Sequence, residues 1–262
     1  MHLSKKRFGQ HFLNSQTYLK AIVDAACVER GDYILEIGPG KGSLTRELLA
    51  RGARVVAIEK DRDLLPFLRK SFAHEIKLGQ LQLIQKDIRD WIPEDLPRKS
   101  YKLVANIPYY ITGAILKNFL TMKRQPSSMT LLLQKEVAAR IARSKKESVL
   151  SLSVKAYGVP LYVKTVPRGV FHPSPTVDSA ILHIAHISRK SFKDRSEEDG
   201  FFDLVHAGFR GKRKQIGGVL AKKFGKKKVE AVFEKLLLPM QTRGEDIPLE
   251  IWLALNRALV NI

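Results

Sequence analysis

The sequence predicts an α/β fold with a mainly parallel sheet, followed by a small all-helical domain. In the first two thirds of the chain, short runs typical of strands alternate with longer amphipathic stretches, which is the order expected of βαβ units. Glycines gather where the first of these runs meets the first amphipathic stretch. After about residue 188 the apolar residues recur every three or four positions, as on helices that cover a core.

Five apolar runs are predicted to be strands of one sheet. Helices are expected between them, for example at residues 43–51 and 62–73. Two later runs, residues 161–166 and 177–184, follow each other without a clear helix, so they are expected to pair antiparallel at one edge. The five strands are expected at residues 33–37, 54–59, 81–84, 101–105 and 129–133.

The composition changes at about Ser188. Residues 188–200 are polar and charged and are interpreted as a linker. Beyond them three helical patterns follow, and Pro248 stands where a first helical turn tolerates it. The predicted boundaries are therefore residues 1–188 for the α/β domain and residues 189–262 for a basic helical domain.

The net charge favours a polyanionic partner. Lys and Arg total 46 against 26 acidic residues, which gives a net charge of +20 and a pI near 10.0. A general habit of the source organism is the alternative explanation. Cys27 is the only cysteine, so we expect neither a disulfide nor a metal site. Neither a secretory leader nor a membrane-spanning run is recognised, and we expect a cytoplasmic monomer.

A glycine-rich turn follows the first predicted strand. It runs from Glu36 to Gly42 and contains Gly38 and Gly40, which let the backbone approach a ligand closely because they have no Cβ. A dinucleotide fingerprint would place a third glycine at position 43, where Ser43 stands. The turn therefore favours a nucleoside cofactor without a pyrophosphate, such as one with a methionyl tail, over a dinucleotide.

Two acidic residues are placed at the ends of the next two strands. Glu59 ends the second predicted strand, where a carboxylate can accept hydrogen bonds from ribose hydroxyls. Asp87 is predicted to end the third strand and to accept from the adenine amine of the cofactor. Either residue alone is more often a solvated strand-end acid. Together with the glycine turn, they predict a nucleoside site.

The tetrad Asn106-Ile107-Pro108-Tyr109 follows the fourth predicted strand. It suits methylation of a planar conjugated amine, whose lone pair is delocalised into the ring. The Asn106 side-chain oxygen and the Ile107 carbonyl would accept the two amine hydrogens, and Pro108 would stiffen the turn. Tyr109 would offer a face on which the base stacks. The alternative is a simple turn with a core tyrosine.

Phe171 begins a proline-rich stretch, residues 171–175, between the two late strands. Its ring is a candidate for the other face of the target base, because enzymes that act on a base take it out of its stack into an aromatic pocket. The alternative is that Phe171 is an ordinary core aromatic residue.

These motifs and their order resemble those of the ribosomal RNA small-subunit adenine dimethyltransferases. The resemblance extends over nearly the whole chain. The resemblance implies a Rossmann-like fold and S-adenosylmethionine as cofactor. The matching blocks are Lys6-Arg7-Phe8-Gly9-Gln10-His11-Phe12-Leu13, Glu36-Ile37-Gly38-Pro39-Gly40, Asn106-Ile107-Pro108-Tyr109, Leu133-Gln134-Lys135-Glu136-Val137-Ala138 and residues 171–180.

The resemblance implies dimethylation of two adjacent adenosines in a loop near the 3′ end of small-subunit rRNA, and with it a role in subunit biogenesis. Related erythromycin-resistance methyltransferases share the tetrad but modify large-subunit rRNA; the first and fourth blocks favour the small-subunit branch. His11 stands where asparagine is commoner in the family. The cofactor pocket implied by the resemblance is lined by His11, Leu13, Gly38, Glu59, Asp87 and Asn106.

Basic residues concentrate in two segments that are candidates for RNA contact. Lys5, Lys6 and Arg7 form the first. The second spans residues 210–228 and has no acidic residue, so that contact with phosphates would offset the repulsion among its charges; a solvated face is the alternative for some of its lysines. Its nine basic residues are Arg210, Lys212, Arg213, Lys214, Lys222, Lys223, Lys226, Lys227 and Lys228.

Two further functions stay open at this point. A DNA adenine methyltransferase would use the same pocket chemistry. A non-catalytic RNA-binding or assembly factor could retain the fold, although Glu59, Asn106 and Tyr109 argue against lost chemistry.

Overall fold

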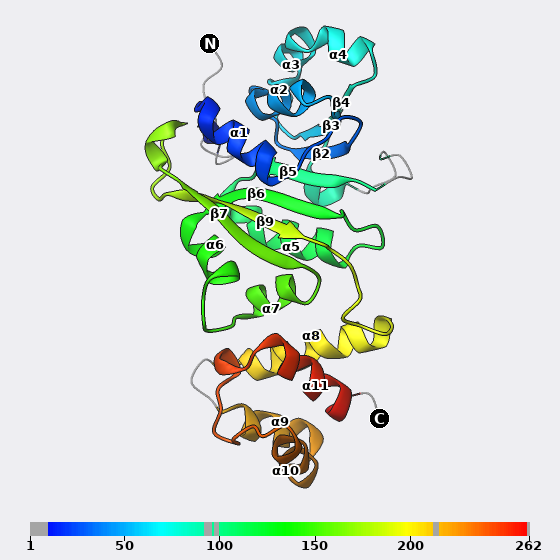
Figure 1. The fold of residues 1–262 in the computed structure, drawn as a ribbon, viewed down its shortest axis with the longest axis vertical. Helices are drawn as coiled ribbons and strands as arrows, with labels where there is room; N and C mark the ends of the chain where they lie inside the picture. Colours follow the sequence, from blue (N-terminus) through cyan, green and yellow to red (C-terminus); the bar gives the residue numbers. More distant parts are fainter. Residues whose placement is uncertain (1–9, 92–95, 97–99, 212–214, 261–262) are drawn as a thin grey trace. The chain divides into compact units, whose positions relative to one another are not determined.

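The computed structural model describes residues 10–91, 96, 100–211 and 215–260 (Figure 1). The chain divides into two compact units. Unit 1 comprises Met1–Ala138 and Pro160–Ile187, and unit 2 comprises Ala139–Val159 and Ser188–Ile262. The final stretch of unit 2 begins at Ser188, and the boundary expected from the sequence lay between residues 188 and 189. The segment Ala139–Val159, which was expected in the first domain, is grouped with unit 2.

A seven-stranded mixed sheet forms the centre of unit 1. Four neighbouring pairs, β4–β3, β3–β2, β2–β5 and β5–β6, are parallel, whereas β6 and β9 are antiparallel. The predicted mainly parallel sheet is therefore confirmed. In spatial order the strands are β4 (Leu81–Gln85), β3 (Arg54–Glu59), β2 (Tyr33–Ile37), β5 (Lys102–Asn106), β6 (Ser128–Gln134), β9 (Ser179–Ala185) and β7 (Val159–Val166).

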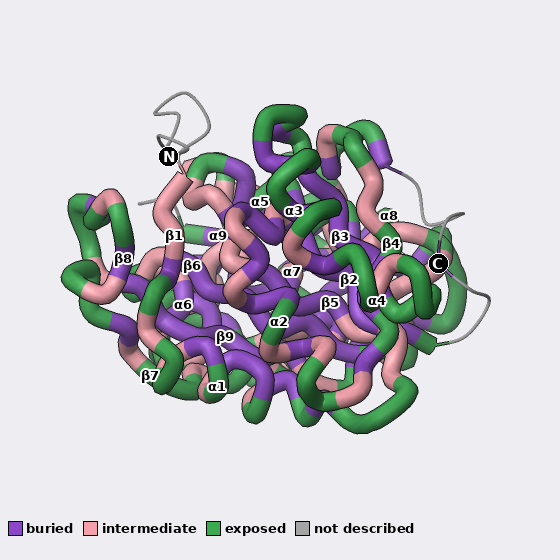
Figure 2. Tube along the Cα trace, turned by 90° about the horizontal axis from the view of Figure 1, so that it is seen from above, coloured by how far each residue is buried: buried purple, intermediate pink, exposed green. Residues whose placement is uncertain are grey.

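The middle strands are apolar on both faces because helices cover the sheet on both sides. Ile34, Leu35, Leu103 and Leu131 have no exposed surface, and the strands labelled β2, β5 and β6 are largely purple in Figure 2. Near-continuous apolar runs of this kind are typical of parallel strands buried on both faces. The core of unit 1 thus holds the strand ends in place.

Among the described residues of unit 1, five helices and a short ribbon accompany the sheet. The helix expected at residues 62–73 begins only at Leu65, because Pro66 suits a first turn, and it breaks at Phe72 before α4. The helices are α1 (Gln16–Ala25), α2 (Ser43–Ala50), α3 (Leu65–Ser71), α4 (Ala73–Lys77) and α5 (Thr112–Thr121). The ribbon pairs β1 (Phe12–Leu13) antiparallel with β8 (Phe171–His172).

The order of the strands creates a switch point at β2. From β2 the chain continues outward through β3 to β4, and it then returns to the opposite side of β2 to form β5. The helices that follow β2 and β5 therefore leave the sheet in opposite directions, and a crevice opens at the carboxyl ends of these strands. This topology places the glycine turn and the tetrad at the same edge of the sheet.

Unit 2 is helical, as the three- and four-residue spacing predicted. Trp252 of α11 is fully buried and stacks against Phe209 of α8, with 5.7 Å between the ring centroids. Helix α6 (Lys135–Ala142) begins in unit 1 and ends in unit 2. The other helices are α7 (Val149–Lys155), α8 (Arg195–Phe209), α9 (Ile216–Phe224), α10 (Lys226–Lys235) and α11 (Leu249–Leu259).

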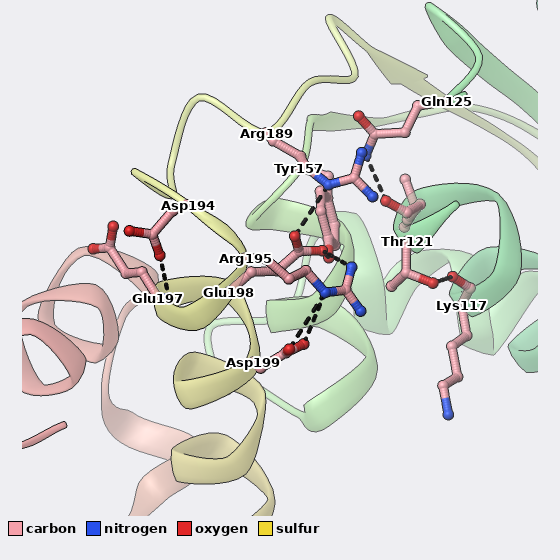
Figure 3. A network of polar contacts seen from close by, with 11 residues as sticks. Lys117, Thr121, Gln125, Tyr157, Arg189, Asp194, Arg195, Glu197, Glu198 and Asp199 are labelled. Carbon is pink, nitrogen blue, oxygen red and sulfur yellow. Dashed lines mark hydrogen bonds and ion pairs between the residues drawn. The ribbon is translucent and has the colours of Figure 1, made fainter. Parts of the chain in front are cut away.

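The predicted linker at residues 188–200 is wrong in its second half, where α8 begins. Asp194 caps this helix by accepting a hydrogen bond from the backbone N–H of Glu197, at 2.9 Å. Glu197 and Glu198, here called the α8 acid pair, are only 4% and 1% exposed. Two of the charges that resembled a solvated linker are thus buried in unit 2, whereas Arg195 and Asp199 beside them stay exposed; Figure 3 shows the contacts around Glu198.

Candidate active site

One pocket of unit 1 lies at the carboxyl ends of β2, β3 and β5. It brings together most of the residues singled out in the sequence, although they come from five separate segments of the chain. The predicted residues among its lining are His11, Leu13, Gly38, Gly40, Glu59, Asp87, Asn106, Ile107, Pro108 and Tyr109.

Two positions of the glycine turn, Gly40 and Gly42, leave no room for a side chain. Gly40 has φ +59°, and a Cβ there would lie 2.9 Å from a ring carbon of Phe12. Gly42 has φ +76°, and its Cβ would lie 2.4 Å from the ring of Phe72. Both the left-handed backbone and the close packing therefore require glycine. The turn brings bare backbone to the pocket wall, as a closely bound ligand needs.

Glu59 is the last residue of β3, as predicted, and is 5% exposed. Its carboxylate accepts hydrogen bonds from the backbone N–H groups of Asp61, at 2.8 Å, and Gly40, at 3.1 Å. Burial raises the pKa of Glu59, and these two N–H groups act against that rise. The carboxylate is thus fixed from both sides and lines the pocket, where hydroxyl donors of a ligand could reach it.

Glu36 is a second buried carboxyl group of the pocket that the sequence reasoning did not assign. It is 1% exposed and accepts a hydrogen bond from the Thr45 hydroxyl at 2.7 Å. Burial raises the pKa of Glu36 to about 8, with a further contribution from the charge of Glu59. Its position as the first residue of the glycine turn was the signal in the sequence that could have identified it.

Asp87 lies in the pocket wall, but not at a strand end. Strand β4 ends at Gln85, and Asp87 instead caps the short 3₁₀ turn at Ile88–Asp90. The Arg89 guanidinium donates to both carboxylate oxygens, from Nη2 to Oδ2 at 2.6 Å and from Nε to Oδ1 and Oδ2 at 3.1 and 3.2 Å, and the Lys60 ammonium lies 2.8 Å away. These contacts, Arg89 first, hold the pKa of Asp87 well below its usual range. The carboxylate is thus ionised and clasped by two cations.

The tetrad has a defined orientation at the end of β5. Asn106 donates through Nδ2 to the backbone carbonyl of His11 at 3.0 Å. Because a carbonyl can only accept, this bond fixes the amide so that Oδ1 is the acceptor left for another donor. Ile107 is buried, and Pro108 has φ −58°. The tetrad can therefore present one directed acceptor to an amine.

Tyr109 is held at its hydroxyl end and leaves its ring in the pocket wall. Its hydroxyl is 2.7 Å from Ser179 Oγ of β9. Burial raises the pKa of Tyr109, so the phenol stays protonated and neutral. The next residue, Tyr110, is 62% exposed and lines the same pocket. A planar base could stack on such aromatic surfaces.

Comparison with known proteins decides the family. The family described as "Ribosomal RNA adenine dimethylase" matches residues 1–258. The chain belongs to this family. It is similar to the ribosomal RNA small subunit methyltransferase A of Dehalococcoides mccartyi, with 40% identity over 95% of this chain and 86% of the relative. It is also similar to the protein of that name from Fusobacterium nucleatum, with 35% identity over 96% of each chain.

Two solved structures share the fold of this dimethylase family member. The 23S rRNA methyltransferase ErmE is 26% identical, with a TM-score of 0.79 over 95% of this chain and 99% of its own. A dimethyladenosine transferase from Plasmodium falciparum is 24% identical, with a TM-score of 0.81 over 95% of this chain and 98% of its own. The Rossmann-like fold with its C-terminal helices is therefore confirmed.

Phe171 differs from the sequence expectation. It is 5% exposed, belongs to the apolar core of unit 1, and lies opposite Leu13 in the β1–β8 ribbon. It does not line the pocket that holds Asn106 and Tyr109. Its apolar ring is held in the core instead of facing that pocket. Phe171 is therefore a core aromatic residue, the alternative given in the sequence analysis. It does not form the pocket wall opposite Tyr109.

The predicted basic residues divide into two sets. Lys5, Lys6, Arg7, Lys212, Arg213 and Lys214 lie outside the described residues. Arg210 at the end of α8 and Lys222 and Lys223 of α9 are exposed in unit 2. Elsewhere in the run, Lys226 pairs with Glu230 at 3.7 Å, and Lys228 donates to the backbone carbonyl of Leu259 at 3.1 Å. Among the ion pairs of the described residues, none joins Arg210, Lys222 or Lys223 to an acidic residue.

Within the described part of the chain, no group of three or more His, Cys, Asp or Glu side chains is arranged to hold a metal ion. The same residues contain no helix that is long and apolar enough to cross a membrane.

Proposed function

We propose that this protein uses S-adenosylmethionine to dimethylate the exocyclic amino groups of two adjacent adenosines in small-subunit rRNA, as part of subunit biogenesis. The observation that carries the proposal is the orientation of Asn106, whose Nδ2 is taken by the His11 carbonyl so that Oδ1 remains as a directed acceptor. The names of the relatives that match over nearly the whole chain support rRNA of the small subunit as substrate.

The residues of the pocket fit a nucleoside methyl donor. Glu59 is a buried carboxylate whose remaining acceptor sites suit vicinal ribose hydroxyls. Asp87 and the backbone beside Ile88 would suit the adenine end, and Glu36, at the start of the glycine turn, would suit the amino acid tail. When bound, S-adenosylmethionine supplies an electrophilic methyl group on a sulfonium. The absence of a third glycine at Ser43 agrees with a ligand that carries no pyrophosphate.

The tetrad acts by position and not by proton abstraction. Asn106 Oδ1 and the Ile107 carbonyl accept the two amine hydrogens of the target adenine, which favours a lone pair that points out of the ring plane. The Tyr109 ring supports the base on one face. The amine loses its proton after it has gained the methyl group, so no side chain needs to remove it beforehand. Preorganised acceptors of this kind lower the barrier because they do not have to reorient during the reaction.

We further propose a division of labour, in which residues 1–188 bind the cofactor and the target base and residues 189–262 dock rRNA. The partner is rRNA within a small subunit or an assembly intermediate, and the setting is the cytoplasm. The exposed Arg210, Lys222 and Lys223 support the docking role, because phosphate contacts position an RNA without reading its sequence. Lys5, Lys6 and Arg7 are proposed as a second RNA contact from the sequence alone, and so are Lys212, Arg213 and Lys214.

The test is transfer of labelled methyl groups to small ribosomal subunits that lack the modification, with large subunits and DNA in parallel and digestion to nucleosides afterwards. We expect dimethyladenosine in small-subunit rRNA alone. The likeness to ErmE makes large-subunit rRNA the second candidate, and label there would transfer the protein to that branch. Label in DNA would identify a DNA methyltransferase. No label anywhere, with RNA binding intact, would identify a non-catalytic assembly factor.

A further inference from the structure

The side chain of His11 makes contacts that a role in the cofactor pocket does not explain. In the β1–β8 ribbon Phe12 lies opposite His172 and Leu13 opposite Phe171. His11 precedes this ribbon, and its Nδ1 lies 2.8 Å from the backbone carbonyl oxygen of Pro173. Since that oxygen can only accept, Nδ1 carries the hydrogen and Nε2 does not need one. The imidazole is therefore fixed in one tautomer and tied to the proline-rich stretch.

The same ring packs against the tetrad. The imidazole of His11 and the phenol ring of Tyr109 are stacked, with 6.1 Å between centroids and 24° between their planes. The Tyr109 hydroxyl is already held by Ser179, 70 residues away in the chain. Tyr109 is thus fixed at its hydroxyl by β9 and at its ring by His11. Two contacts at different ends of a ring define its plane better than either alone.

The backbone of His11 completes the link. Its carbonyl oxygen is the acceptor that orients the Asn106 amide, at 3.0 Å. One residue therefore contacts the amide that directs the amine, the ring on which the base would stack, and the stretch that follows β8. The contact with Asn106 needs only the backbone, whereas the contacts with Tyr109 and Pro173 need this particular side chain.

We propose that the His11 side chain is a positioning residue for the acceptor base. Its imidazole is anchored by the hydrogen bond to Pro173 and stacks on Tyr109, and this stacking fixes the plane of the Tyr109 ring so that an adenine stacked there meets Asn106 Oδ1. The proposal rests on the proposed function and refines it. It assigns the imidazole to the RNA side of the pocket, while the His11 backbone serves the tetrad.

Two substitutions separate the two contacts. His11→Gln keeps a side-chain donor but loses the ring, and His11→Phe keeps a ring but loses the donor. We expect each to lower kcat/KM for the rRNA substrate roughly three- to tenfold, the loss that one aromatic pair or one hydrogen bond corresponds to. The dissociation constant of S-adenosylmethionine, measured by calorimetry without RNA, should stay within about twofold of the parent value. The matched control is His74→Gln, at an exposed position of α4.

A measurement on the ligand-free protein separates this proposal from the proposed function. Nitrogen NMR of ¹⁵N-histidine-labelled protein, assigned with His11→Gln, should report the Nδ1–H form for His11. An Nε2–H form would overturn the proposal even if the protein methylates rRNA. Weakened S-adenosylmethionine binding in both variants, with KM for rRNA unchanged, would also overturn it and assign the imidazole to the cofactor. If the parent protein methylates no RNA, the proposed function fails while the NMR result still stands.

Discussion

Among the described residues, each unit of the molecule buries two glutamates, and the two pairs have opposite kinds of partner. Glu36 and Glu59 of unit 1 receive hydrogen bonds from a hydroxyl and from backbone N–H groups, and burial raises the pKa of both. Among the ion pairs of the described residues, neither has a Lys or Arg partner. A carboxyl group that is held by neutral donors keeps acceptor capacity for a ligand.

The α8 acid pair of unit 2 is neutralised within the protein. Glu198 accepts from Arg189 Nε at 3.0 Å and Arg195 Nη1 at 3.3 Å, and the Tyr157 hydroxyl donates to it (Figure 3). Glu197 receives Arg257 Nε at 2.7 Å. Burial opposes the ionisation of Glu197, but the Lys193 N–H and Arg257 hold its pKa below its usual range. Burial of an acid therefore does not mark a site by itself; the kind of partner distinguishes a binding group from a structural one.

The largest expected effect is a loss of stability in Glu198→Gln. Removing the charge leaves Arg189 and Arg195 without their buried partner. Because water can reach these two guanidinium groups, which are 31% and 63% exposed, the cost in the free energy of unfolding should be up to about 3 kcal/mol, the lower end of the range for a fully buried pair. For a chain of this size the melting temperature should fall by up to roughly 10 °C. Methyl transfer at 25 °C should stay near the parent rate.

The control for this variant is Glu230→Gln, which removes an exposed pair with Lys226 at 3.7 Å. Such a pair contributes about 0.5 kcal/mol at most, so its melting temperature should barely change. Equal losses in the two variants would mean that burial does not distinguish the α8 acid pair.

The next effect concerns activity and not stability. Asn106→Ala removes the directed acceptor of the pocket, and we expect kcat for methyl transfer to fall on the order of 100-fold or more, as when one preorganised transition-state hydrogen bond is removed. Binding of small-subunit rRNA, measured by filter retention, should stay close to the parent value. A kcat close to that of the parent protein would show that Asn106 does not take part in methyl transfer.

The sequence predicted the parts of this comparison that depend on strand ends. Glu59 and the tetrad could be placed because the carboxyl ends of parallel strands meet at one edge of a sheet, and the strand limits 33–37 and 54–59 agree with the structure. Helix existence in unit 2 followed from apolar spacing. Such features depend on residues close together in the chain, which is why periodicity reveals them.

The remaining features depend on contacts between distant residues. His11 and Pro173, which share a hydrogen bond, are 162 positions apart, so no local sequence pattern predicts their contact. Asp87 was expected at the end of a strand, but it caps a 3₁₀ turn, and that turn brings Arg89 onto its carboxylate. The α8 acid pair resembled a solvated linker because composition does not reveal burial. Charged residues mislead sequence reasoning when tertiary structure supplies their counterions.

Glu36→Gln tests, through the pH dependence of stability, the glutamates of unit 1 that are held by neutral donors. In the unfolded chain this carboxyl has its ordinary pKa of 4.5 and is ionised at neutral pH, while the folded protein keeps the proton up to about pH 8. The folded state therefore binds one proton more, and its contribution to stability is lost as pH rises. Between about pH 6 and 7.5 the parent protein should lose roughly 2 kcal/mol through this group.

Glutamine keeps the hydrogen bond from Thr45 but has no proton to lose, so the variant should show a flatter pH dependence over this window. The free energy of unfolding is measured by urea titration at several pH values. The exposed Glu234→Gln serves as control and should follow the parent curve. Parallel curves for the parent and Glu36→Gln would mean that Glu36 is ionised in the folded protein, and the contrast with the α8 acid pair would disappear.

The smallest effect concerns exposed lysines that have no acidic partner among the described ion pairs, unlike Arg189 and Arg257, which pair with Glu198 and Glu197. Lys222→Gln combined with Lys223→Gln removes two exposed charges of α9, whereas Lys70→Gln with Lys77→Gln removes two exposed charges of α3 and α4. If the α9 lysines contact phosphates, the slope of log affinity for small-subunit rRNA against log salt should decrease by about 1.5, at roughly 0.7–0.9 per contact. The α3 and α4 pair should leave the slope nearly unchanged. Equal slopes for the two double variants would show that only the net charge of +20 attracts the RNA, because a charge that touches no phosphate releases no counterion.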